Sequence, residues 1–151
     1  MTATKEIANL GVPWEEAYGY AQAVKVGHII CVSGQLSHDA AGKLVGPAPL
    51  DASGRPADFG NMGVQMQTTY ENARRLLAHF GATFDQVVEE TLYVLDVPAA
   101  FAVAGDVRRG VYGKIPRVAS NLIGVSRLAF PEQLIEITFR VDLSVAQRQH
   151  P

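Results

Sequence analysis

The sequence predicts an α+β fold with the element order β-β-α-β-α-β-β, in which two helices cover one face of a mixed sheet. Two observations carry this prediction. Apolar residues recur at three- and four-residue spacing over residues 61–80 and 99–112, and they alternate with polar ones over residues 134–143. A chain of 151 residues, 48% of them hydrophobic, is long enough to bury one core. We therefore expect a single domain over residues 1–151.

Two strands are expected near the N-terminus. Residues 1–19 are mixed in character and are expected to be irregular. Residues 20–26 alternate as a strand does, and after a tight Gly-His turn residues 29–33 form a second strand. From Gly34 to about residue 58 the chain is rich in glycine, proline, aspartate and serine. We expect a long loop there, and loops beyond about 12–15 residues are usually functional or mobile.

Two amphipathic helices follow. The first is expected over residues 61–80, where one apolar stripe ends at Gly81. The second is expected over residues 99–112, because Gly113 and Pro116 then stop the helical pattern.

Three further strands complete the prediction. Residues 87–95 are rich in β-branched side chains and lie between the two helices. Residues 120–128 and 134–143 are expected to be the final strands, joined by a short turn.

The last strand has two chemically different faces. Four apolar side chains share one face and four polar side chains share the other, because successive residues of a strand point to opposite sides. The apolar set is Ile135, Ile137, Phe139 and Val141, and the polar set is Glu136, Thr138, Arg140 and Asp142. Two helices can cover only the apolar face. The polar face is then either solvated or closed by other subunits.

Composition narrows the classes of function. The formal charge is −2 and the 13 Lys and Arg residues are scattered, so nucleic-acid binding is not expected. The single cysteine, Cys31, excludes an internal disulfide and a cysteine-based zinc site, and it is expected to be a small buried side chain. The four histidines lack metal-ligand spacing, so no metal is expected. The sequence has no phosphate loop or dinucleotide fingerprint, so no cofactor is expected either. No apolar run is long enough to span a membrane, and we expect a cytoplasmic protein.

Glu136 is the strongest candidate for chemistry. It lies between Ile135 and Ile137 in an apolar run. Burial of a carboxylate raises its pKa, so Glu136 could hold or relay a proton to a water near neutral pH. The alternative is an exposed strand residue, because Glu is rarely buried.

Several other residues could form a site around this carboxylate. Ser33 and Gly34 end a strand and open the long loop, and Gly34 permits close approach of a ligand. Tyr20 could hydrogen-bond or stack on a substrate, and Ser120 with Asn121 could present a hydroxyl and backbone amides to an anion. Each of these also has a plain structural reading as a turn or edge residue.

Taken together, these segments resemble the Rid (YjgF) family of enamine/imine deaminases over about residues 18–143. The matching pieces keep the same order and spacing, and they are residues 19–27, 29–35, Gln65, Asn72, Leu76, Gly81, residues 87–96, Phe101, and residues 125–128 and 134–137. The resemblance implies a chorismate-mutase-like homotrimer, in which three sheets form a central barrel, the helices lie outside, and three pockets lie between neighbouring subunits. It would close the polar sheet face and bury Glu136 at a subunit junction.

The resemblance also implies a reaction. In the family, a glutamate-held water hydrolyses an imine without a cofactor, and an arginine binds the substrate carboxylate. Tyr20, Ser33 and Glu136 fall on family pocket positions.

The resemblance further implies that the pocket differs from that of the arginine-containing members. The arginine falls on Ser120, and Arg117 lies three residues before it; Gly105 stands where many members have asparagine, and Leu122 where some have cysteine. A serine cannot give a carboxylate the two-pronged cationic contact of arginine. The chain therefore resembles an arginine-lacking branch.

We therefore predict cofactor-free hydrolysis of a small imine, enamine or related C=N compound in a pocket between subunits. Glu136, Ser33 and Tyr20 would carry the chemistry. Residues expected to contact the substrate are Ser120, Asn121, Gly34, Leu122, Gly105 and Arg117. The alternatives are a non-catalytic ligand-binding or chaperone-like trimer and an endoribonuclease-like activity.

Overall fold

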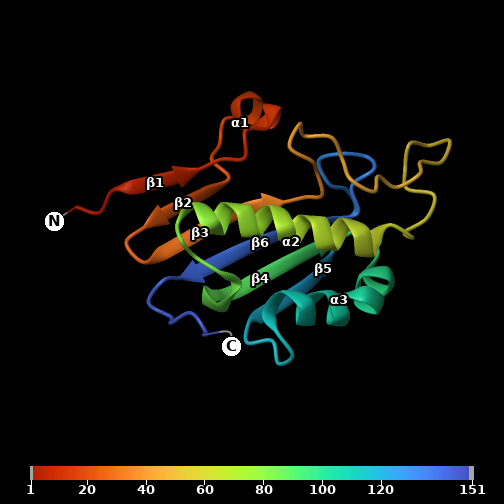
Figure 1. The fold of residues 1–151 in the computed structure, drawn as a ribbon. Coiled ribbons are helices and arrows are strands. Elements are labelled where there is room, and N and C mark those ends of the chain that lie inside the picture. The colour runs from red at the N-terminus through yellow and green to blue at the C-terminus, as the bar shows by residue number, and fades with distance from the viewer. Residues whose placement is uncertain (1, 150–151) are drawn as a thin grey trace.

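A computed structural model describes residues 2–149 and contains one six-stranded sheet with the strand order β1-β2-β3-β6-β4-β5. All neighbouring strands are antiparallel except β4 and β5, which are parallel. The strands span Lys5–Ala8 (β1), Ala23–Val26 (β2), Ile29–Gln35 (β3), Val87–Val94 (β4), Ala119–Gly124 (β5) and Ile135–Asp142 (β6). The predicted mixed sheet is therefore present, with one additional strand at its N-terminal edge (Figure 1).

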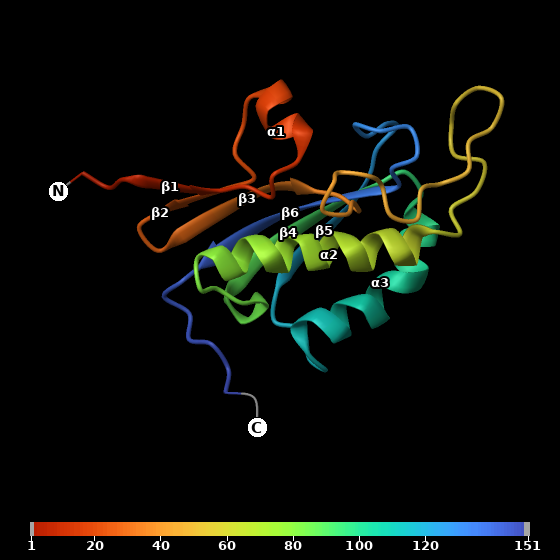
Figure 2. The same ribbon diagram turned by 45° about the horizontal axis from the view of Figure 1, so that its top comes forward.

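Two long helices cover one face of this sheet. They are α2 (Met62–His79) and α3 (Val97–Tyr112), and both predicted helices are thus confirmed to within two residues at each end (Figure 1). A short helix, α1 (Pro13–Tyr18), lies on the opposite side of the sheet, as Figure 2 shows. One turn of 3-10 helix, η1 (Phe84–Gln86), precedes β4.

The core lies between the sheet and the two long helices. Along β6 the four apolar side chains are buried, and the polar ones between them are only partly buried or exposed. The helices contribute the other half of this core with Met66, Tyr70 and Leu77 of α2 and Ala100 of α3. The opposite face of the sheet is open except where α1 lies over it.

The expected short turn between the last two strands is wrong. β5 is parallel to β4, whereas β6 is antiparallel to β4 and pairs with its other side. The connection over residues 125–134 must therefore cross the end of β4. Parallel strands need a crossover, here α3, and this crossover places β5 at the sheet edge instead of beside β6.

The N-terminal segment is more regular than the sequence suggested. The Glu15 side chain accepts hydrogen bonds from the backbone N–H groups of Leu10, Gly11 and Val12, which closes the start of α1. Gly19, with φ of 85°, ends the helix in a left-handed conformation.

The long loop over residues 34–58 is fixed by two buried amides of α2. The Asn72 side chain donates to the carbonyls of Leu36 and His38 at 2.9 and 3.0 Å. Gln65 donates to the carbonyls of Gly46 and Glu132 and accepts from the N–H of Leu134. These bonds join the loop to the connection before β6.

The expected burial of Cys31 is wrong. Cys31 is exposed, because it lies on the open face of β3, opposite Arg140 of β6. On α3, the Nε of Arg108 lies 2.9 Å from Oε1 of the buried Glu90.

Candidate functional site

A cavity of about 600 Å³ lies on the open face of the sheet, beneath α1. Strand β3, strand β6, helix α1 and the connection before β6 all contribute to its walls. Its lining consists of Trp14, Tyr18, Tyr20, Ser33, Gly34, Leu36, Ala129, Phe130 and Glu136. The structure thus brings together four of the predicted site residues: Tyr20, Ser33, Gly34 and Glu136.

Glu136 is the only carboxylate in this lining. It lies in the middle of the sheet, opposite Tyr93 of β4, and its side chain is half-buried. Burial raises the pKa of the Glu136 carboxyl, and a hydrogen bond from the Gln133 side chain opposes that rise only in part. No lysine, arginine or histidine lines the cavity, and within residues 2–149 Glu136 forms no ion pair. The carboxylate is therefore placed to accept a proton.

Gly34 makes room for this carboxylate. The β3–β6 pairing is irregular between Val32 and Gln35, so Gly34 lies at a bulge facing β6. A Cβ atom built on Gly34 would overlap the carboxylate of Glu136. The glycine is thus required by the close approach of the Glu136 side chain.

Ser33 and Tyr20 form the polar rim around Glu136. The Ser33 hydroxyl donates to the carbonyl of Ala21 at 2.9 Å, which fixes its direction and leaves its lone pairs free to accept. Burial, followed by the negative charge of Glu15, raises the pKa of the Tyr20 phenol. Tyr20 therefore keeps its proton at neutral pH and can act as a donor.

The aromatic walls were not anticipated. Trp14 packs edge-on against Phe130 with ring centroids 5.3 Å apart, and Tyr18 packs against Tyr20 at 5.4 Å. Residues 13–18 were expected to be irregular, so their side chains had no predicted direction. The spacing of Trp14 and Tyr18 by four residues is the available signal, because it places both rings on one face of a helix.

Ser120 lies outside this cavity, on the helix-covered side of β5. Its hydroxyl donates to Oε1 of Glu90 at 2.8 Å. Tyr70 and Tyr112 donate to Oε2 of the same carboxylate at 2.8 and 2.6 Å. Burial raises the pKa of both phenols, so they remain donors. Sequence reasoning did not identify Glu90, which is 1% exposed.

Arg108 completes the group around Glu90. Its Nε is at ion-pair distance from the carboxylate, but the N–H direction is not aligned for a hydrogen bond. The contact is therefore electrostatic.

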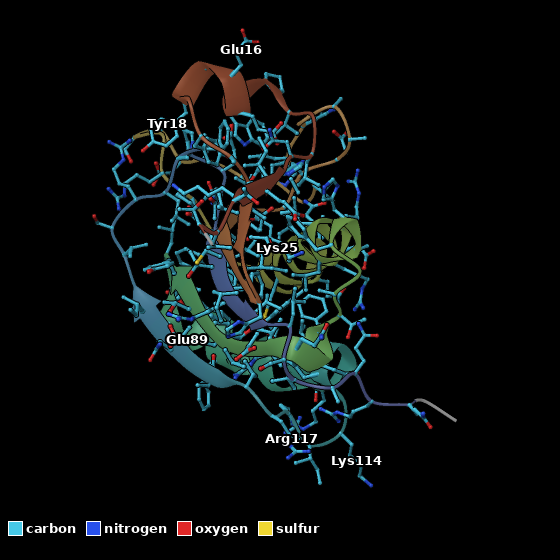
Figure 3. The ribbon with its side chains drawn as sticks, turned by 90° about the vertical axis from the view of Figure 1, so that its left-hand side faces the viewer. Glu16, Tyr18, Lys25, Glu89, Lys114 and Arg117 are labelled. Atoms are coloured by element: carbon cyan, nitrogen blue, oxygen red, sulfur yellow. The ribbon has the colours of Figure 1, made fainter. Side chains whose placement is uncertain are left out.

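The remaining predicted residues also lie away from the cavity of their own chain. Asn121 approaches the hydroxyl of Thr91 at 3.4 Å on the open sheet face, and Leu122 packs toward the core. Gly105 lies in α3, close to the guanidinium of Arg109. Arg117 is exposed, and Figure 3 places it with Lys114 at the end of the molecule opposite Tyr18.

Two further observations concern metals and membranes. Among residues 2–149, no three His, Cys, Asp or Glu side chains gather as metal ligands would. In the same part of the chain, every helix is too short or too polar to cross a membrane.

Comparison with known proteins gives matches over most of the chain. Residues 14–142 match the sequence profile of the family described as Endoribonuclease L-PSP. A RutC family protein of Pyrococcus abyssi is 32% identical over 109 residues, which are 72% of this chain and 75% of that protein.

Solved structures share the fold. RidA from an Antarctic Psychrobacter species is 25% identical, with a TM-score of 0.66 over 82% of this chain and 88% of that one. A YjgF family member from Mycobacterium tuberculosis is 24% identical, with a TM-score of 0.71 over 92% of this chain and 99% of that one. The predicted α+β, chorismate-mutase-like fold is thereby confirmed for the single chain.

Proposed function

The chain belongs to the Endoribonuclease L-PSP family, which is the YjgF/Rid family, and on this premise we propose that it hydrolyses a small imine, enamine or related C=N compound without a cofactor. One observation carries the proposal. A half-buried carboxylate with a raised pKa faces a cavity large enough for a small metabolite, with no cationic side chain beside it. Such a group is suited to activate water near neutral pH.

The reaction follows from the positions of the polar groups. Glu136 takes a proton from a water molecule, whose oxygen forms a bond to the carbon of the C=N group. The electron pair of the C=N bond moves to nitrogen, which takes the proton from Glu136 and gives a neutral carbinolamine. Glu136 then takes the proton of the carbinolamine hydroxyl and passes it to nitrogen. The C–N bond breaks as the C=O bond forms, and ammonia leaves a carbonyl product. Tyr20 and Ser33 orient the substrate at the rim.

The lining of the cavity also limits the substrate. Ser120 occupies the place of the family arginine, and its hydroxyl is already donated to Glu90. We therefore propose a substrate that lacks a carboxylate at the usual place or carries it elsewhere. Asn121 and Arg117 would contact it only from another subunit.

A homotrimer would complete this pocket. The open face of the sheet carries Thr138 and Arg140 of β6 and the exposed Cys31 of β3, and α2 and α3 cannot reach it. Strand β5 forms the opposite edge of the sheet and carries Asn121 on the open face, where a neighbouring subunit could present it to the cavity. Light scattering should give three chains per particle, and a stable monomer would contradict the shared pocket.

We place the protein in the cytoplasm, since an unpaired cysteine suits a reducing compartment.

Ammonia release tests the activity directly. An oxidase would generate imines in situ from a panel of amines and amino acids, and ammonia would be followed with and without the protein. We expect acceleration for imines without an α-carboxylate and weaker acceleration for 2-imino acids. If no imine in the panel is hydrolysed faster than in buffer, the hydrolase proposal is wrong.

Replacing Gly34 by alanine should displace Glu136 and lower kcat by roughly 10²-fold, since a shift of about 1 Å at a reacting group has that effect. The control is Gly110→Ala in α3, where an added Cβ meets no atom within 4 Å. That variant should keep full activity. A Gly34→Ala protein with unchanged kcat would mean that the position of Glu136 does not matter.

A non-catalytic ligand-binding trimer is the second candidate. The hydrogen bond from Ser120 to Glu90 favours this second candidate. The position that binds the substrate carboxylate in arginine-containing members is here taken up by a contact within the chain. In that case ligands would saturate the cavity while ammonia release stayed at the level of buffer. An RNA-cleaving activity has less support, because the cavity lining offers no cation to a phosphate.

A further inference from the structure

The cavity has the composition of a binding site for an organic cation. Trp14, Tyr18, Tyr20 and Phe130 supply four aromatic rings to its walls, and Glu136 supplies its only charge. Aromatic faces and carboxylates both attract cations, and both disfavour anions. We propose that this aromatic box binds the substrate as a protonated imine, an iminium ion, with apolar substituents on its carbon. The proposal rests on the hydrolytic function proposed above and names its substrate class.

The rings are arranged in two edge-to-face pairs. The Trp14 and Phe130 planes meet at 63° and the Tyr18 and Tyr20 planes at 66°. In such a pair the edge of one ring touches the face of the other, so each pair leaves ring faces unoccupied. His38 packs against Trp14 at 88°, with centroids 5.1 Å apart, which fixes the indole from behind.

The charges around the rings favour a cation. The cavity lining contains one acidic side chain and no basic one. Glu15, at the start of α1, adds a second negative charge close enough to act on Tyr20. The imidazole of His38, which packs against Trp14, donates its Nδ1–H to the Asp39 carbonyl and does not line the cavity.

A cationic substrate also suits the chemistry. An iminium carbon is more electrophilic than that of a neutral imine, and its positive charge beside Glu136 favours the ionised carboxylate that the base step needs. Water adds to the carbon, the C–N bond breaks, and the products are a carbonyl compound and ammonium, so that charge and atoms balance. Leu36 and Ala129 give the carbon substituents an apolar surface.

Binding is testable with three probes of nearly equal shape. Isobutyramidinium is a planar cation with a C=N bond, isobutyramide is its neutral counterpart, and isobutyrate is the anion. Trp14 is the single tryptophan of the chain and lines the cavity, so its fluorescence reports binding directly. We expect the cation to bind roughly 10- to 100-fold more tightly than the amide, the range for a hydrogen bond to a charged group, and isobutyrate to bind most weakly.

Two variants each remove one aromatic ring from the cavity wall, and they test whether the rings cause the preference for the cation. Phe130→Leu keeps an apolar side chain but removes a ring, and should lower the preference for cation over amide by roughly 3- to 30-fold. Tyr18→Ala removes a ring that is 81% exposed, so its effect on folding should be small. The matched control is Phe101→Leu, which removes a ring that is 76% exposed on α3, outside the cavity, and should leave the preference unchanged.

The outcomes distinguish this inference from the hydrolase proposal. Equal affinities for the three probes, tighter binding of isobutyrate, or an unchanged preference in Phe130→Leu would overturn the cation site. If the cation is preferred but no imine is hydrolysed, the cation site stands and the protein is a binding module. If 2-imino acids are hydrolysed fastest and isobutyrate binds best, the hydrolase stands and the cation site falls.

Discussion

Replacing Glu136 by glutamine is expected to lower kcat for imine hydrolysis by roughly 10²- to 10⁴-fold, the usual contribution of a general base. Glutamine keeps the shape of the side chain but cannot take a proton from water. The measurement is ammonia release at saturating substrate. Asp142→Asn is the matched control, because Asp142 lies on the same strand and is bonded to Ser144, remote from the cavity. Equal rates for Glu136→Gln and the native protein would remove Glu136 from the mechanism.

The pH dependence of this effect has a defined sign. Burial raises the pKa of Glu136, and only the ionised form can act as a base. The rate should therefore rise with pH through a value above that of an ordinary glutamate, and this limb should be absent in Glu136→Gln.

The free energy of unfolding should fall as pH rises, whereas the rate of hydrolysis rises. A raised pKa in the folded state means that the native protein binds the proton more tightly than the unfolded chain. The stabilisation that this tighter proton binding gives is fully present below the pKa of Glu136 in the unfolded chain. It is lost as pH rises through the pKa of Glu136 in the folded protein. At neutral pH Glu136→Gln should be at least as stable as the native protein, which separates loss of catalysis from loss of folding.

Replacing Glu90 by alanine should lower the free energy of unfolding by about 3–5 kcal/mol, the range for removing one partner of a buried ion pair. Three hydroxyls, those of Tyr70, Tyr112 and Ser120, donate to this carboxylate, and Arg108 lies against it. Without Glu90 the two buried phenols and the guanidinium lose their common partner. Denaturant unfolding at pH 7 measures the effect.

The neighbouring residue supplies the control. Glu89 lies on the same strand but is exposed on the open face of the sheet (Figure 3). Glu89→Ala should change stability by less than about 0.5 kcal/mol. If Glu90→Ala does not fold, Glu90→Gln is the alternative variant, because it keeps an acceptor for the phenols without the charge. Its free energy of unfolding should be lower than that of Glu89→Ala and higher than that expected for Glu90→Ala. A Glu90→Ala protein as stable as Glu89→Ala would show that the cluster does not hold α3 to the sheet.

Much of the fold could be read from periodicity alone. In α2, α3 and β6, apolar residues recur at a regular spacing over most of the element. This spacing specifies whether the segment is a helix or a strand, and which of its faces is buried. The position of β5 could not be read in this way. Strand pairing depends on contacts between residues far apart in sequence, and nothing within residues 119–124 says that β4, and not β6, is the partner.

The site was predictable where a residue conflicts with its surroundings. Glu136 in an apolar strand and Gly34 at a strand end are unusual in themselves, and the structure places them in contact. Trp14 and Phe130 are ordinary aromatic residues in short segments, so only the folded chain shows that they meet. Glu90 was missed because its four partners come from α2, α3 and β5, which no local pattern connects.

The central place of β6 determines when the chain can fold during its synthesis. This strand lies between β3 and β4 and pairs with both, although it is the last strand to leave the ribosome. Until it emerges, the strands β1–β3 and β4–β5 are two separate pieces with unpaired inner edges. Such edges are prone to pair with other chains, and pairings across long sequence separations form slowly. The nascent chain therefore keeps two unpaired strand edges until residue 142 has emerged, and the six-stranded sheet cannot be completed before then.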